Sequence, residues 1–207
     1  MTASDAVAAA PDRSQVTGVI LAGGRGQRMG GLDKGLQPLH GAPLAAHVMQ
    51  RLQPQVGALL ISANRHADRY AALGAPVVGD HAGGFPGPLA GMLAGLEAAN
   101  TPFVITVPCD SPFLPGDLVA RLGAALMLGH ADAAFAITDS GPHPVFALLR
   151  TSLAGSLAQA LARDERRVQA WLARHKAVQV HFPDERPFYN INTLEDLHAY
   201  ERRGPAA

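Results

Sequence analysis

Short apolar runs alternate with helical patterns along almost the whole chain. Each run ends in glycine, proline or small polar residues, as a buried strand does where it enters a loop. This alternation predicts βαβ units around a mostly parallel, twisted sheet with helices on both faces, an α/β fold. The expected strands are residues 18–21, 58–61, 76–78, 103–107, 133–138, 145–149 and 178–182. The expected helices are residues 43–53, 66–73, 88–99, 115–128, 153–162, 165–175 and 193–202.

The length of 207 residues fits one domain, for which roughly 100–200 residues is usual. We expect this domain to span residues 16–203. Residues 1–15 have no basic stretch and only a short alanine run, so they are expected to form a disordered tail rather than a signal peptide. The last four residues, 204–207, are expected to fray.

Composition excludes several classes of protein. A content of 48% hydrophobic and 16% charged residues rules out an intrinsically disordered chain. Lys+Arg 17 balances Asp+Glu 17, so there is no basic excess for nucleic acid or for a membrane surface. A single cysteine excludes an internal disulfide, and no apolar stretch reaches about 18 residues. We expect a soluble, cytoplasmic domain with no nucleic-acid or membrane partner.

The loop after the first expected strand is rich in glycine and basic residues. In sheets of this kind ligands bind beyond the carboxyl ends of the strands, where the strand order switches. The segment from Leu21 to Lys34 holds clustered glycines, whose backbone N–H groups can converge on an anion, and three cations: Arg25, Arg28 and Lys34. This composition points to a polyphosphate ligand. A solvated loop without a ligand is the alternative reading.

Two well-known phosphate motifs do not match this loop. A Walker A loop needs Gly-Lys-Ser/Thr after its spacer, whereas the chain has Asp33-Lys34-Gly35. The dinucleotide fingerprint needs glycines at another spacing and an acidic residue after the second strand, where the chain has Ser62-Ala63-Asn64. A nicotinamide dinucleotide is therefore disfavoured.

A second candidate loop follows the strand at residues 103–107. Its sequence is Pro108-Cys109-Asp110-Ser111-Pro112. A carboxylate beside a polyphosphate loop is suited to hold Mg²⁺, which prefers one or two carboxylates together with phosphate oxygens. The alternative is that Asp110 only caps the following turn. Cys109 is expected to be a small buried residue at the strand end, without a catalytic role.

Further candidates lie at other strand ends. Asp80 could meet a nucleoside or the metal, or could be a turn residue. Ser62 and Asn64 could bind a base or ribose, or could cap the next helix. The segment 84–91, rich in glycine and proline, could form a wall for a flat ring, or could let a helix pack closely.

Three more features carry weaker signals. His143 stands in Gly-Pro-His-Pro and reads as a turn residue that could also touch a substrate. The charged segment Arg163–Arg167 reads as solvated, with a second phosphate as the other possibility. Asn190 and Asn192 alternate before a helix that Thr193 and Asp196 are expected to cap, so both could face the site. Nine histidines show no zinc-ligand spacing.

Four motifs in order resemble the molybdenum cofactor guanylyltransferases. They are L-A-G-G-x-x-x-R-M-G-G-x-D-K at residues 21–34, P-G-P-L-A-G at 86–91, P-C-D-x-P at 108–112 and N-x-N-T at 190–193. The first motif alone marks the wider nucleotidyltransferase superfamily, and the combination is more specific. Related cytidylyltransferases begin with L-A-A-G, whereas position 23 here is glycine. The similarity runs from about residue 17 to residue 200.

The resemblance implies a Rossmann-like domain and a Mg²⁺-dependent transfer of GMP from GTP to molybdopterin. It implies catalytic roles for Arg28, Lys34 and Asp110, with Asp110 also holding the metal. Possible partners are the proteins that insert or chaperone the molybdenum cofactor. The residues implied in GTP binding are Leu21, Ala22, Gly23, Gly24, Lys34, Ser62, Asn64, Asp80 and Asp110, and those implied in pterin binding are Asn190 and Asn192.

One position departs from the family pattern, because the second strand ends in Ser62 where members often carry asparagine. The nearest rival activities are a sister enzyme that uses CTP and one that uses a sugar 1-phosphate. A rival from another class is a protein that binds GTP or the pterin without turnover. Activity assays with each nucleotide and acceptor distinguish them.

Overall fold

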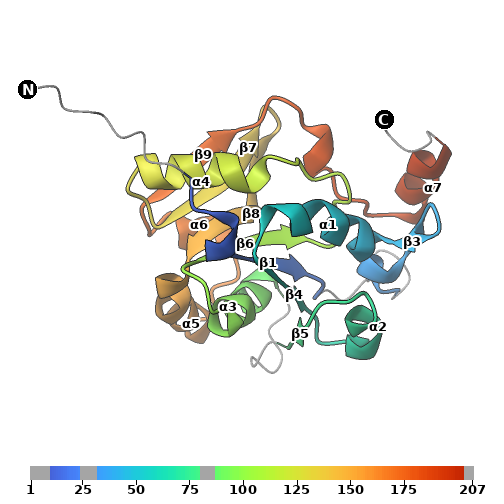
Figure 1. Ribbon diagram of the computed structural model, residues 1–207, viewed down its shortest axis with the longest axis horizontal. Coiled ribbons are helices and arrows are strands. Elements are labelled where there is room, and N and C mark those ends of the chain that lie inside the picture. The colour runs from blue at the N-terminus through green and yellow to red at the C-terminus, as the bar shows by residue number, and fades with distance from the viewer. Residues whose placement is uncertain (1–9, 24–31, 80–86, 203–207) are drawn as a thin grey trace, which may run out of the picture.

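The computed structural model describes residues 10–23, 32–79 and 87–202, and these form a seven-stranded mixed sheet with helices on both faces (Figure 1). The strands of the sheet are β1 (Val16–Leu21), β4 (Ala58–Ser62), β5 (Val77–Val78), β6 (Phe103–Pro108), β7 (Ala133–Thr138), β8 (Gly141–Arg150) and β9 (Ala177–His181). The α-helices are α1 (Leu44–Leu52), α2 (Ala67–Ala71), α3 (Pro88–Ala98), α4 (Leu118–Leu128), α5 (Ala154–Ala162), α6 (Val168–Leu172) and α7 (Leu194–Arg202). A small hairpin pairs β2 (Pro38–Leu39) with β3 (Ala42–Pro43).

The strand order β5-β4-β1-β6-β8-β7-β9 places a switch point between β1 and β6. The chain adds β4 and β5 on one side of β1, and then returns to place β6 on the other side. All four strands are parallel, so their carboxyl ends meet at one edge. In sheets of this kind, ligands bind between the loops that follow the two strands at the switch point. Here those loops are the ones that follow β1 and β6.

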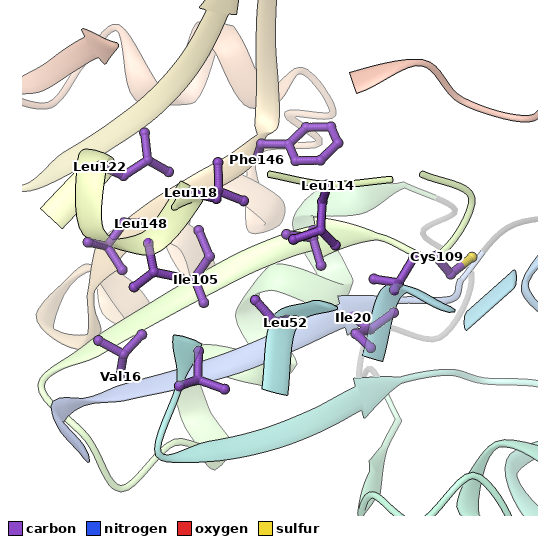
Figure 2. Packing of buried hydrophobic residues seen from close by; sticks show 14 of the residues in the cluster. Val16, Ile20, Leu52, Ile105, Cys109, Leu114, Leu118, Leu122, Phe146 and Leu148 are labelled. Carbon is purple, nitrogen blue, oxygen red and sulfur yellow. The ribbon is translucent and has the colours of Figure 1, made fainter. Parts of the chain in front are cut away.

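Side chains of β1 alternate between the two faces of the sheet. Val16 and Ile20 belong to the cluster that packs under α1 and α4. Val19 and Leu21 belong to the cluster that packs against α3, α5 and α6. Figure 2 shows the first cluster at close range, with Cys109 where β6 ends. Burial on both faces explains why the strands read as nearly continuous apolar runs.

Helix α3 packs unusually close to the sheet because two of its glycines lack a side chain. A Cβ on Gly91 would lie 2.8 Å from Ser62 Oγ, and a Cβ on Gly95 would lie 2.7 Å from a Val19 methyl. The close-packing interpretation of the segment 84–91 is therefore supported at Gly91, whereas a Cβ on Gly87 would meet nothing within 4 Å. Residues 84–86 lie outside the described part of the chain.

The structure corrects the expected pairing in the second half of the sheet. β8 is longer than expected and runs antiparallel to both β6 and β7, so the sheet is mixed. The interpretation of His143 as a turn residue is wrong, because it lies within β8 opposite Ala136. Helix α6 is shorter than predicted, since residues 165–167 precede it.

The structure also describes part of the expected N-terminal tail, residues 10–15. Residues 13–15 form a 3-10 helix, which Asp12 caps by accepting from the Ser14 backbone N–H at 2.9 Å. Pro11 packs against Gly123 of α4. Residues 10–15 are thus part of the fold, because they cover α4. The rest of the expected tail, residues 1–9, and the expected frayed end, residues 204–207, lie outside the described residues.

Within the described ranges, no helix has both the length and the apolar character needed to span a membrane.

Candidate functional site

Backbone hydrogen bonds tie the three loops at the switch point together. The Ala22 N–H donates to the Ser62 carbonyl at 2.8 Å, and the Cys109 N–H donates to the Leu21 carbonyl at 3.1 Å. Leu21 and Ala22 are buried, whereas Gly23 is exposed at the start of the glycine-rich loop. The carboxyl edge thus holds its loops at fixed spacing, as a preorganised binding site requires.

Lys34 connects two segments that lie far from it in sequence. It lies in the short 3-10 turn at Lys34–Leu36, directly after the glycine-rich loop. Its Nζ lies 3.4 Å from Asp110 Oδ2, which follows β6, and donates to Asn192 Oδ1 at 2.8 Å, which precedes α7. Three of the predicted site residues therefore form one cluster at the carboxyl edge.

Asp110 is a largely buried carboxylate. Its side chain is 13% exposed and that of Lys34 is 22% exposed. Burial raises the pKa of Asp110 above its usual value, while the Lys34 cation and its hydrogen bond pull the pKa back down. The side-chain partner that the described residues provide for Asp110 is the Lys34 cation, and a carboxylate in this setting is matched to positive charge.

The segment before α7 is fixed against the loop after β6. The Ser111 hydroxyl donates to Asn190 Oδ1 at 2.7 Å, and the Ile191 N–H donates to the Asp110 carbonyl at 2.9 Å. Ile191 itself is buried between the hairpin and α7. Asn190 and Asn192 therefore both lie against the cluster, as their alternation predicted.

The predicted capping box at the start of α7 is present. The Thr193 N–H donates to Asp196 Oδ2 at 2.9 Å, and the Asp196 N–H donates to the Thr193 hydroxyl at 3.0 Å. The Asn192 N–H also donates to Asp196 Oδ2 at 3.1 Å. The cap therefore fixes the backbone that presents the Asn192 side chain to Lys34.

On the other side of β1, the structure places two predicted residues differently. Ser62 is buried, and its hydroxyl faces Gly91 of α3. Asn64 is exposed, and its Oδ1 lies beside Gly79, at the carboxyl end of β5. Of these two, Asn64 has the side chain that a ligand at this edge can reach. The predicted residues Gly24, Arg28 and Asp80 lie outside the described part of the chain.

His143 lies toward the same edge on the β6 side of the switch point. Because β8 is antiparallel to β6, the first residues of β8 lie near the carboxyl end of β6. The His143 ring stacks on Phe188 with centroids 5.0 Å apart, and its Nε2 shares a hydrogen bond with the Thr138 hydroxyl at 2.9 Å. Burial lowers the pKa of His143, which favours the neutral ring.

The charged segment 163–167 makes local ion pairs. Arg166 pairs with Asp164 at 2.9 Å, and Glu165 pairs with Arg174. These pairs agree with a solvated charged segment, and the alternative of a second phosphate site stays a prediction.

The donor set at the cluster fits a magnesium ion that is shared with a phosphorylated ligand. No group of three or more His, Cys, Asp or Glu side chains converges on one point in the residues that the structure describes. Mg²⁺ does not need such a group, because it usually keeps several waters and takes one or two carboxylates together with phosphate oxygens. A carboxylate has about four lone-pair sites, so Asp110 can accept from Lys34 and still bind a cation.

Sequence reasoning missed two parts of this arrangement. The sequence marks Ser111 only as part of a loop, whereas its bond to Asn190 links segments 79 positions apart. Tyr70 was not singled out, although its hydroxyl donates to Asp33 Oδ1 at 2.5 Å. No sequence signal marks either contact, since both depend on how distant segments pack.

The fold and the cluster define an α/β protein whose Lys34, Asp110 and Asn192 side chains meet at a switch point between parallel strands. Residues 18–179 match the family described as the MobA-like NTP transferase domain, and the chain belongs to this family. It is therefore a nucleotidyltransferase.

The chain is 58% identical to a protein of Burkholderia ambifaria that is named a molybdenum cofactor guanylyltransferase, over 95% of this chain and 100% of that protein. It is 52% identical to a protein of the same name from Cupriavidus taiwanensis, over 92% of this chain and 98% of that protein. The crystal structure of molybdopterin-guanine dinucleotide biosynthesis protein A from Archaeoglobus fulgidus has a TM-score of 0.74 to this structure, at 24% identity, over 90% and 97% of the two chains. The Archaeoglobus structure confirms the fold.

Proposed function

We propose that this protein transfers GMP from GTP to molybdopterin, releasing pyrophosphate and forming a molybdopterin guanine dinucleotide. The observation that carries the proposal is the position of Lys34, whose Nζ contacts Asp110 on one side and Asn192 on the other. This cation lies between the phosphate-binding edge and the segment associated with the acceptor. The names of the relatives support the choice of guanine and of the pterin.

The two substrates take opposite sides of the switch point. GTP lies across the carboxyl ends of β1 and β4, with Leu21, Ala22, Gly23 and Gly24 around its phosphates and Asn64 and Asp80 toward its nucleoside. Ser62 contributes through the backbone carbonyl that positions Ala22. Molybdopterin lies toward β6 and β8, where Ser111 of the loop after β6 holds Asn190 and Lys34 holds Asn192.

The reaction is an in-line displacement at phosphorus. An oxygen of the terminal phosphate of molybdopterin attacks the α-phosphorus of GTP, the bond from that phosphorus to the bridging oxygen breaks, and pyrophosphate leaves. The attacking phosphate is already anionic near neutral pH, so no strong general base is needed. The protein's contribution is then positioning and charge stabilisation.

Lys34 and Arg28 stabilise the charge that develops on the triphosphate. Asp110 would hold a magnesium ion, which would neutralise phosphate charge and polarise the phosphoryl oxygens. Asp110 also keeps Lys34 at the edge of the sheet, where its ammonium group can reach a phosphate. We expect the reaction to take place in the cytoplasm. Its product would pass to proteins that insert or chaperone the molybdenum cofactor.

Product formation from α-labelled GTP, CTP and ATP, each with Mg²⁺ and molybdopterin, tests the proposal. Labelled pterin dinucleotide and equimolar pyrophosphate from GTP alone are the expected result. Product from CTP instead would agree with the proposed reaction but contradict guanine as the base that is transferred. Tight GTP binding without product from any nucleotide would contradict the activity and favour a binding protein.

A further inference from the structure

Asp33, the residue before Lys34, is held through both its side chain and its backbone. The Tyr70 hydroxyl donates to Asp33 Oδ1 at 2.5 Å, and Gln37 Nε2 donates to the Asp33 carbonyl at 2.8 Å. The Gln37 N–H donates in turn to the Lys34 carbonyl at 3.0 Å. The backbone on both sides of Lys34 is thus fixed by a residue of α2 and by the turn itself.

Tyr70 has no access to a ligand, because its side chain is completely buried. It lies in the cluster under α1, in a helix whose other residues are exposed. Burial raises the pKa of Tyr70, so that its hydroxyl remains a protonated donor at any physiological pH. Any effect of this hydroxyl on the reaction must therefore pass through neighbouring residues, and Asp33 is the one that accepts its hydrogen bond.

Gly35 provides the space that this contact requires. A Cβ at position 35 would lie 2.5 Å from the Tyr70 hydroxyl oxygen and 3.1 Å from Cys109 Sγ. Helix α2, the turn at Lys34 and the residue before Asp110 therefore meet at one point under the site. Such a junction can set the distance between the ammonium group of Lys34 and the carboxylate of Asp110.

We propose that Tyr70 is a positioning residue, whose hydroxyl holds Asp33 and thereby holds Lys34 against Asp110 and Asn192. The link from Lys34 to turnover rests on the function proposed above, whereas the placement of Lys34 does not. A residue of this kind supports the charge that acts in the transition state without touching a substrate.

Replacing Tyr70 with phenylalanine keeps the packed ring and removes the hydroxyl. We expect kcat/KM for GTP to fall about tenfold. This is less than the roughly hundredfold loss of rate that a misplacement of about 1 Å can cause. Asp33→Asn keeps an acceptor oxygen and should retain most activity, whereas Asp33→Ala should resemble Tyr70→Phe. If the two residues act as a unit, Tyr70→Phe combined with Asp33→Ala should be no worse than either single variant.

A second measurement reads the position of Lys34 without any turnover. The chain has only two lysines, Lys34 and the exposed Lys176 at the other end of the sheet, so each molecule carries its own reference. The rates at which an activated acetate ester modifies the two lysines can be compared by mass spectrometry. In Tyr70→Phe we expect the ratio of Lys34 to Lys176 modification to rise about fivefold, the factor that one hydrogen bond typically contributes to an equilibrium.

Tyr200→Phe is the control, because the Tyr200 ring packs at a tilt against Phe113, with centroids 5.0 Å apart, and the substitution should leave the ratio unchanged. A higher ratio of Lys34 to Lys176 modification in Tyr70→Phe, with no such increase in Tyr200→Phe or Asp33→Asn, would support the proposal. An unchanged ratio in a folded Tyr70→Phe protein would overturn it. If the wild-type protein makes no product from any nucleotide, the proposed function fails, and the lysine ratio still decides the role of Tyr70.

Discussion

The Lys34 ammonium group donates to the Asn192 side-chain oxygen at 2.8 Å, although the two residues are 158 positions apart. This contact closes the site between the first loop of the sheet and the segment before the last helix. Asp110 lies on the other side of the same ammonium group, at 3.4 Å. The charge of Lys34 is therefore shared by two groups that arrive from separate parts of the chain, and each of them can be altered independently.

Lys34→Met should abolish most of the activity and also weaken the fold. The substitution removes the cation and keeps an unbranched side chain of similar length. Since Asp110 stays buried without its partner, we expect the free energy of unfolding near neutral pH to fall by about 1–3 kcal/mol. Urea denaturation measures the change. Lys34→Met combined with Asp110→Asn should recover the loss, and failure of the double variant to do so would contradict the pairing.

Asp110→Asn should abolish transfer but leave the protein at least as stable as the wild type at pH 7. Because burial raises the pKa of Asp110, its carboxylate lowers the stability of the native state at neutral pH, and the cost disappears as pH falls and the group becomes protonated. The advantage of the variant should therefore shrink between pH 7 and pH 4. Urea unfolding at both pH values checks this expectation. A variant that is less stable at pH 7 would show that the pair with Lys34 outweighs the cost of burial.

Gly95→Ala should destabilise the contact between α3 and β1. The new methyl group would lie 2.7 Å from one Val19 methyl and 2.9 Å from the other, in a fully buried part of the core. Overpacking of this kind costs about 1–3 kcal/mol, which exceeds the roughly 1 kcal/mol that alanine gains over glycine in a helix.

Gly155→Ala in α5 is the matched control for this prediction, since apart from its own helix backbone and chain neighbours nothing lies within 4 Å of its new methyl group. The control should gain stability by up to about 1 kcal/mol. The free energies of unfolding of the two variants, measured by thermal and urea denaturation, should thus change in opposite directions relative to the wild type. Equal behaviour would contradict the close approach of α3 to the sheet.

The sequence predicted the parallel half of the fold well because each of its strands is an apolar run bounded by loop residues. It also predicted that Lys34 and Asp110 would share one edge, since loops at the carboxyl ends of parallel strands converge. For Asn192 the sequence offered only the alternation with Asn190, from which both side chains could face the site. It did not predict that β8 would insert antiparallel between β6 and β7. Strand polarity depends on the hairpin at residues 138–141, and periodicity does not show the direction in which a strand is paired. The contact of Tyr70 with Asp33 escaped for a similar reason, because a buried hydroxyl leaves no pattern in a sequence.

His143→Asn should flatten the dependence of stability on pH below neutrality. Burial lowers the pKa of His143, whereas the ring titrates near 6.5 in the unfolded chain. As pH falls below that value, the unfolded state binds a proton that the native state does not, so the native state loses stability; above it the two states are equally neutral and the contribution is complete. The urea midpoint of the wild type should therefore fall more steeply than that of the variant between pH 7 and pH 5. Parallel curves would show that the ring stacked on Phe188 is as easily protonated in the native state as in the unfolded chain.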